Sequence, residues 1–298
     1  MCLSAVIMIF ERYLQMDTDL LAEKYGLDAF EREELSEYLR NRFDGAREHD
    51  LESFEQLAVW KKLAVLAEMA GAAEVINRKL IPKCPVEFAD PDGVRLEIFD
   101  SFAGEIPIVY TRAASDFEAL VTNIVHKGKR PENIGHTGAS FISGRTVRFI
   151  ILSAKPYSNV TADELGIEDD DWAERSLLIR RSHECTHYFT KQVYGISNNI
   201  LHDELMADLI GLYDACGQFK AEWFLRFMGV IKGSGGRLAV YTGGLSAKVR
   251  CAVEEILVNA AEGLEKWSLS DGFKELDNAE RIKIMCHAGI CGMADLQN

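Results

Sequence analysis

Apolar residues recur at helical spacing through the first eighty residues, with charged residues between them. This spacing is typical of amphipathic helices that bury one face. The clearest sets are Leu20, Leu21 and Tyr25, then Leu35, Leu39 and Phe43, then Leu57, Leu63 and Leu66. We expect this helical N-terminal segment to cover a sheet formed by later residues, with a prodomain and a partner-binding module as alternatives. The apolar residues 2–10 are predicted to begin a buried helix.

In the middle of the chain the apolar pattern changes to alternation, which indicates strands. Residues 94–99 and 106–110 alternate at least in part, and residues 144–152 form the strongest strand candidate. A short helix is expected over 116–126. A loop rich in Gly, Lys and Pro is expected over 127–138. Strands followed by helices favour an α+β fold over a doubly wound sheet.

The prolines divide the chain into three parts. All six lie between residues 82 and 156, and proline is excluded from helix interiors. We therefore predict a helical N-terminal segment (1–81), a central region of strands followed by two helices (82–220) and a helical C-terminal subdomain (221–298). A glycine-rich loop over 232–237, with a hinge or lid as one reading of it, precedes a long helix expected over 246–267.

Composition and charge limit the partners and the cellular location that the protein is expected to have. The net charge of −14 argues against nucleic acid or an anionic membrane as partner, because phosphate binding requires a basic face. The seven cysteines are odd in number and scattered, which favours reduced thiols. The opening residues lack a basic region before their short apolar run, so neither a secretory signal nor a membrane span is expected. The predicted location is the cytoplasm.

The chemistry is concentrated in the pentapeptide His183-Glu184-Cys185-Thr186-His187. Residues four apart lie on one face of a helix, so both imidazoles can reach one metal ion. The glutamate projects from further round the helix, where it can hold a water molecule without being a ligand. Acidic residues at 170–174, including a near capping box from Asp171 to Glu174, and Gly195 bound a predicted helix over 172–194.

A second helix is predicted to begin near His202. Glu204 and Asp208 lie four residues apart on it, and Gly211 on nearly the same side would let two helices approach closely. A catalytic zinc keeps three protein ligands and one open position. His202 is the rival third ligand, and because it and Glu204 point apart on a helix, only one of them can serve. The pairing of Glu204 with Asp208 favours Glu204.

The pentapeptide followed by E-x-x-x-D resembles the gluzincin branch of the zincin metallopeptidases, the thermolysin-like group. The resemblance covers about residues 172–212. It implies a zincin-like fold, with a mixed or antiparallel sheet packed on the first metal helix. It also implies one zinc ion per chain held by His183, His187 and Glu204, with Glu184 as general base and Asp208 orienting His183. Asp203 stands where these enzymes usually have Asn.

The resemblance also implies a donor for the developing oxyanion and an edge strand that binds extended substrate. The candidate donors are Tyr241, Tyr157, Tyr194 and His287. Tyr241 ranks first because it follows the ligands in a predicted loop flanked by glycines. The edge strand is expected near Phe141 or within 145–152, with an ordinary interior strand as the alternative.

Three functions remain open at this point. The first is a zinc-dependent metallopeptidase that acts on peptides or proteins through a metal-activated water, with Glu184 as base. The second is a zincin-like hydrolase of a non-peptide amide, or one limited to processing itself. The third is a non-catalytic zinc-binding interaction protein. A groove along an exposed edge strand would favour the first function, and a closed pocket would favour the second.

Overall fold

The computed structural model of the protein describes residues 18–144, 146–168, 170–197, 200–233 and 235–296. The predicted helix at 2–10 therefore lies outside the described residues, as does residue 145 of the strand predicted over 144–152. The chain forms two compact units. The sheet unit contains residues 48–197 and 210–217, and the helical unit contains residues 1–47, 198–209 and 218–298. Each unit collects separate stretches of chain, whereas the segments predicted from the prolines are consecutive.

A mixed four-stranded sheet forms the centre of the sheet unit, with strand order β1-β2-β4-β3. The strands are β1 (Val94–Ser101), β2 (Gly104–Thr111), β3 (Ala139–Ser143) and β4 (Arg148–Ser153). β1 and β2 form an antiparallel hairpin, β2 and β4 are parallel, and β3 is antiparallel to β4. The fold is thus α+β. The Phe141 region supplies an edge strand, whereas β4 is interior.

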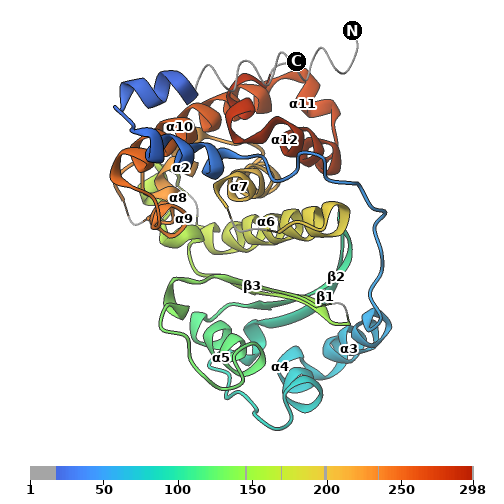
Figure 1. Cartoon of the computed structure of the whole chain (residues 1–298). Helices are drawn as coiled ribbons and strands as arrows, with labels where there is room; N and C mark the ends of the chain where they lie inside the picture. Colours follow the sequence, from blue (N-terminus) through green and yellow to red (C-terminus); the bar gives the residue numbers. More distant parts are fainter. Residues whose placement is uncertain (1–17, 145, 169, 198–199, 234, 297–298) are drawn as a thin grey trace. The chain divides into compact units, whose positions relative to one another are not determined.

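Helices cover both faces of this sheet (Figure 1). The helices α3 (Leu57–Ala70), α4 (Ala72–Val75) and α5 (Ala114–Ile124) pack on one face, and α6 (Trp172–Tyr194) packs on the other. Part of the helical N-terminal segment therefore covers the sheet, as expected from its apolar spacing. The core between α3, α5 and the sheet includes Trp60, Leu63, Phe117, Leu120 and Ile151.

Helix α6 has the bounds that its sequence predicts. It ends at Gly195, which adopts the left-handed conformation at φ 70° that favours glycine at this position. The predicted capping box at its start is wrong, because the Asp171 side chain makes no capping hydrogen bond. The backbone of Asp171 has already turned toward helical angles, with ψ at 16°, whereas a capping residue is normally extended.

The helical unit is built around α10 (Ala247–Leu269), which is longer than the other helices assigned wholly to this unit and packs against α2 (Ala29–Leu39), α8 (Ala221–Met228) and α12 (Asn278–Gly292). Two short helices, α9 (Leu238–Thr242) and α11 (Asp271–Glu275), also belong to it. Side-chain caps fix the starts of α2, α10 and α12 at Asp28, Ser246 and Asp277. No helix in the described part of the chain combines the length and apolar character needed to cross a membrane.

Helix α7 (Leu201–Cys216) is continuous, and its first residues belong to the helical unit and its last to the sheet unit. In the sheet unit, Gly211 of α7 packs on α6: a Cβ at this position would lie 2.7 Å from the carbonyl oxygen of Ile179. The predicted close approach at Gly211 is confirmed. Any side chain larger than hydrogen would separate the two helices.

Candidate metal centre

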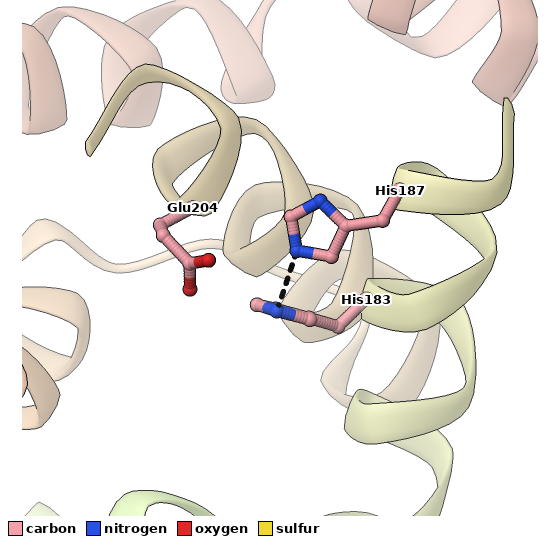
Figure 2. A group of neighbouring side chains, drawn as sticks. All are labelled: His183, His187 and Glu204. Atoms are coloured by element: carbon pink, nitrogen blue, oxygen red, sulfur yellow. Dashed lines mark hydrogen bonds between the residues drawn. The ribbon is translucent and has the colours of Figure 1, made fainter. Parts of the chain in front are cut away.

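The two histidines of the pentapeptide face each other on α6 (Figure 2). The Nε2 atoms of His183 and His187 are 3.1 Å apart. Their ring planes are nearly perpendicular, at 78°, with centroids 4.8 Å apart. Both side chains are buried, with exposed fractions of 6% and 7%. The four-residue spacing thus places two ring nitrogens at one point, as the helix geometry predicts.

Glu204 of α7 completes a group of three buried side chains (Figure 2). One ligand atom from each of His183, His187 and Glu204 lies within 4.8 Å of the others. The side chain of the rival ligand, His202, points elsewhere: its Nε2 atom lies 3.0 Å from the Met285 carbonyl oxygen. Among the described residues, the structure therefore brings together the three predicted ligands and leaves the alternative out.

The donor set fits a zinc ion. Two nitrogens bound to one tetrahedral zinc at about 2.0–2.1 Å would lie roughly 3.3 Å apart, close to the 3.1 Å between the two Nε2 atoms. Two imidazoles and one carboxylate are three protein ligands, the number found in catalytic sites, whereas structural zinc sites usually have four.

The second ring nitrogen of His183 has a partner that the sequence did not assign to it. Nδ1 lies 2.9 Å from the hydroxyl oxygen of Tyr157. Tyr157 follows β4 and was expected, at most, as an oxyanion donor. Its hydroxyl instead contacts the ring nitrogen that does not face His187. No sequence signal indicates this contact, because the two residues come from different elements.

Arg237 pairs with both carboxylates of the E-x-x-x-D segment. Its Nη1 lies 3.5 Å from Glu204 Oε2, and its Nη2 contacts Asp208 Oδ2. No sequence feature singles out this residue, which is the last of the glycine-rich loop over 232–237. The role of Asp208 in orienting His183 stays a prediction. The ion pairs also supply a positive charge between carboxylates that would otherwise repel each other at this spacing.

Tyr241 lies four residues after Arg237, and it is close enough to Glu204 for the carboxylate to affect the pKa of its phenol. Burial, and then the negative charge of Glu204, raise the pKa of Tyr241 well above its usual value, so the hydroxyl remains a donor at physiological pH. The expectation that Tyr241 lies in a glycine-flanked loop is wrong, because residues 238–242 form α9.

The remaining predicted residues are placed as follows. Glu184 is half-buried on α6, one residue after His183. The hydroxyl of Tyr194 lies 3.4 Å from Glu48 Oε1, and His287 is exposed on α12. Of the four candidate oxyanion donors, Tyr157 contacts His183, and Tyr241 is close enough to Glu204 for its pKa to be affected.

The glycine-rich loop before Arg237 is attached to the end of α8. The amides of Gly236 and Arg237 both donate to the carbonyl of Phe227. A Cβ at Gly235 would overlap the carbonyl oxygen of Arg226. These contacts anchor the end of the loop that carries Arg237.

The chain matches a protein family whose function is not known. Residues 81–147 and 146–297 match a family of unknown function, DUF7005. The chain belongs to this family. No curated protein and no solved structure matches the chain.

Proposed function

We propose that the protein is a zinc-dependent metallopeptidase of the gluzincin type. The observation that carries the proposal is the convergence of His183, His187 and Glu204, all less than a tenth exposed, with ligand atoms within 4.8 Å of one another. The H-E-x-x-H pentapeptide on one helix and E-x-x-x-D on the next support it, because both carry the resemblance to zincins.

The proposed chemistry assigns a step to each side chain. A zinc ion held by the three ligands would lower the pKa of water to about 7 and polarise the substrate carbonyl. Glu184 takes a proton from the attacking water and delivers it to the leaving nitrogen. Tyr241 donates a hydrogen bond to the carbonyl oxygen as negative charge develops on it. Its protonated phenol suits this role.

The edge strand β3 supports a peptide substrate. Among the described strands, β3 pairs with β4 alone, so the backbone groups of its other side are available to a further strand. Helix α6 packs against both β3 and β4. An extended peptide that pairs with β3 would therefore be held beside the helix that carries the two histidines. This observation favours a peptide over a non-peptide amide.

One observation favours a second function, that of a non-catalytic protein. Arg237 already balances the charges of Glu204 and Asp208. A buried carboxylate needs a positive partner, and a guanidinium meets that need without a metal ion. In this alternative the histidines and carboxylates form a structural polar cluster, and function lies in binding another molecule.

A cytoplasmic location is part of the proposal. Cys84 and Cys251 are exposed and carry free thiols, which suits a reducing compartment.

Metal analysis separates the two functions. The protein is purified without chelator and its zinc content measured by mass spectrometry, beside His183→Ala, Glu204→Ala and His202→Asn variants. We expect about one zinc per chain in the wild type and in His202→Asn, and none in the other two. Wild-type protein that binds no zinc after zinc is added back would overturn the metallopeptidase.

Activity is then tested with a peptide library. Wild type is expected to cleave a subset of peptides, whereas Glu184→Gln, which keeps all three ligands, is expected to bind zinc and cleave none. Zinc binding without cleavage in the wild type would favour the non-catalytic function. Equal cleavage by both proteins would remove Glu184 from its assigned role.

A further inference from the structure

We propose that Tyr157 is the positioning residue that orients His183 for metal binding, and that Arg180 holds Tyr157 in place. This inference rests on the metal site of the proposed function. All of the residues that carry it belong to the sheet unit. It differs from the resemblance to zincins, which assigns the orientation of this histidine to the carboxylate of Asp208.

The two nitrogens of the His183 ring have different partners. Nε2 lies 3.1 Å from His187 Nε2, whereas Nδ1 lies 2.9 Å from the hydroxyl oxygen of Tyr157. A neutral imidazole that binds a metal through Nε2 carries its proton on Nδ1. That N–H then donates to the phenol oxygen. The contact accommodates this tautomer, because the phenol oxygen can accept from Nδ1–H, and it restricts the rotation of the ring.

The Tyr157 side chain is itself buried and anchored. Only 4% of it is exposed. Its backbone amide donates to the hydroxyl of the buried Ser176, at 3.0 Å. Ser158 and Asn159 then adopt left-handed backbone angles, with φ of 51° and 61°. Two consecutive non-glycine residues in this region are costly, and such strain persists where the surroundings determine it.

Arg180 fixes the segment that leads to Tyr157. It lies three residues before His183 on α6 and donates to the carbonyls of Ser153, Lys155 and Pro156, at 2.9, 2.6 and 2.9 Å. Its guanidinium also lies 5.3 Å from the centre of the Tyr157 ring, within the range of a cation–π interaction. One helix thus carries both the histidine and the arginine that places its partner.

The backbone around Arg180 is shaped to admit its side chain. Gly138 precedes β3, and a Cβ at this position would overlap the guanidinium. Arg180 is 4% exposed. The buried arginine binds three carbonyls of one short segment. Each of these charge-assisted hydrogen bonds restricts the segment further, so the arginine fixes its conformation.

The choice of a phenol has a chemical consequence. A carboxylate partner would add a negative charge beside the metal ligand, whereas a phenol accepts a hydrogen bond from Nδ1–H and is neutral. Tyr157 therefore fixes the direction of the ring while leaving its charge unchanged. Removal of the hydroxyl should weaken metal binding without disturbing the helix.

The test compares Tyr157→Phe with the wild type in zinc affinity, measured by competition with a chromophoric chelator. We expect zinc to bind about 10- to 100-fold more weakly, the range seen when a ligand loses its hydrogen-bonded partner. Tyr110→Phe is the matched control. It also removes a phenol hydroxyl from the sheet unit, one that lies 2.6 Å from Glu97, and it should leave zinc affinity unchanged.

The proton position on the His183 ring can also be measured without zinc. Nitrogen-15 chemical shifts of the His183 ring report which nitrogen carries the proton. We expect the shift of Nδ1 to change in Tyr157→Phe and not in Tyr110→Phe. Unchanged shifts, or a zinc affinity of Tyr157→Phe equal to that of the wild type, would overturn the positioning role. Absence of zinc binding by the wild type would overturn the proposed function alone.

Discussion

Gly211 of α7 and Ile179 of α6 pack backbone against backbone, such that a Cβ on the glycine would lie 2.7 Å from the isoleucine carbonyl oxygen. The contact sets the spacing of the helix that carries both histidines and the helix that carries Glu204. A hydrogen at position 211 is therefore a requirement of the site as well as of the core.

We expect Gly211→Ala to destabilise the protein by about 1–3 kcal/mol, the usual cost of forced overpacking. Alanine gains about 1 kcal/mol in helix propensity, but the overlapping atom is backbone, which cannot move as a side chain can. Urea unfolding measures the change. Gly135→Ala is the control, because a Cβ there meets no atom within 4 Å. Equal stability of both variants would contradict the prediction.

Arg237→Met should destabilise the metal-free protein strongly, because it leaves Glu204 and Asp208 buried without their guanidinium. The loss of one partner from a buried ion pair costs about 3–5 kcal/mol, and Arg237 is only 22% exposed. Saturating zinc should reduce the loss, since the ion supplies positive charge to Glu204. Unfolding in urea is compared with chelator and with zinc.

The control for this variant is Arg78→Met. Arg78 pairs with Glu74 on the surface, where such pairs contribute about 0.3–0.5 kcal/mol. It should show a small loss that zinc does not change. An Arg237→Met loss that is equally large with chelator and with zinc would show that the metal does not replace the guanidinium.

The free energy of unfolding should depend on pH through Lys155. Burial, and then the positive charge of Arg180, lower the pKa of its amine from 10.5 to about 8. Between these values the unfolded chain binds more protons than the folded protein, so stability should rise with pH over this window. Below pH 8 the lysine is charged in both the folded and the unfolded state, so the destabilisation caused by burying its charge no longer changes with pH.

Comparison with Lys155→Gln isolates the Lys155 contribution, because glutamine can still donate to the Gly135 carbonyl that the lysine contacts. The difference in unfolding free energy between wild type and variant should change between pH 8 and 10. NMR of reductively methylated lysines measures the pKa directly, and a Lys155 resonance that titrates above pH 10 would contradict the prediction.

Cys185 should resist modification although it lies inside the metal-binding pentapeptide. It is fully buried, and burial is the first cause that raises the pKa of its thiol to about 12. The thiolate is the reactive form, so iodoacetamide at pH 8 should label the exposed Cys84 and Cys251 and leave Cys185 unlabelled. Peptide mass spectrometry reads the outcome. Labelling of all three at similar rates would show that α6 opens.

The parts of the site that the sequence predicts are those governed by local geometry. The helix over 172–194 follows from the acidic residues at its start and from Gly195, which ends it. The His183–His187 pair follows from a four-residue spacing on that helix. The E-x-x-x-D pairing favours Glu204 over His202, and of these two the structure places only Glu204 with the histidines.

The parts that the sequence does not predict depend on residues distant in the chain. Tyr157 reaches His183 because Arg180 binds the segment just before Tyr157, and because the two residues after Tyr157 take left-handed backbone angles. Neither feature has a residue pattern. Helix α9 is too short to show periodicity, and the glycines that follow it suggested a loop. The parallel pairing of β2 with β4 is equally hidden, since alternation identifies strands but not their partners.

The sheet topology gives the two halves of the proposed site different assembly requirements. The histidine pair requires only that α6 has formed, and helix formation depends on contacts between residues close in sequence. The edge β3 is held through β4, and β4 joins the hairpin through pairs such as Ile108 with Ile150. Contacts this distant in sequence carry a larger loop-closure cost and form slowly. During refolding, the imidazole pair should therefore be in place before the strand that would receive a peptide.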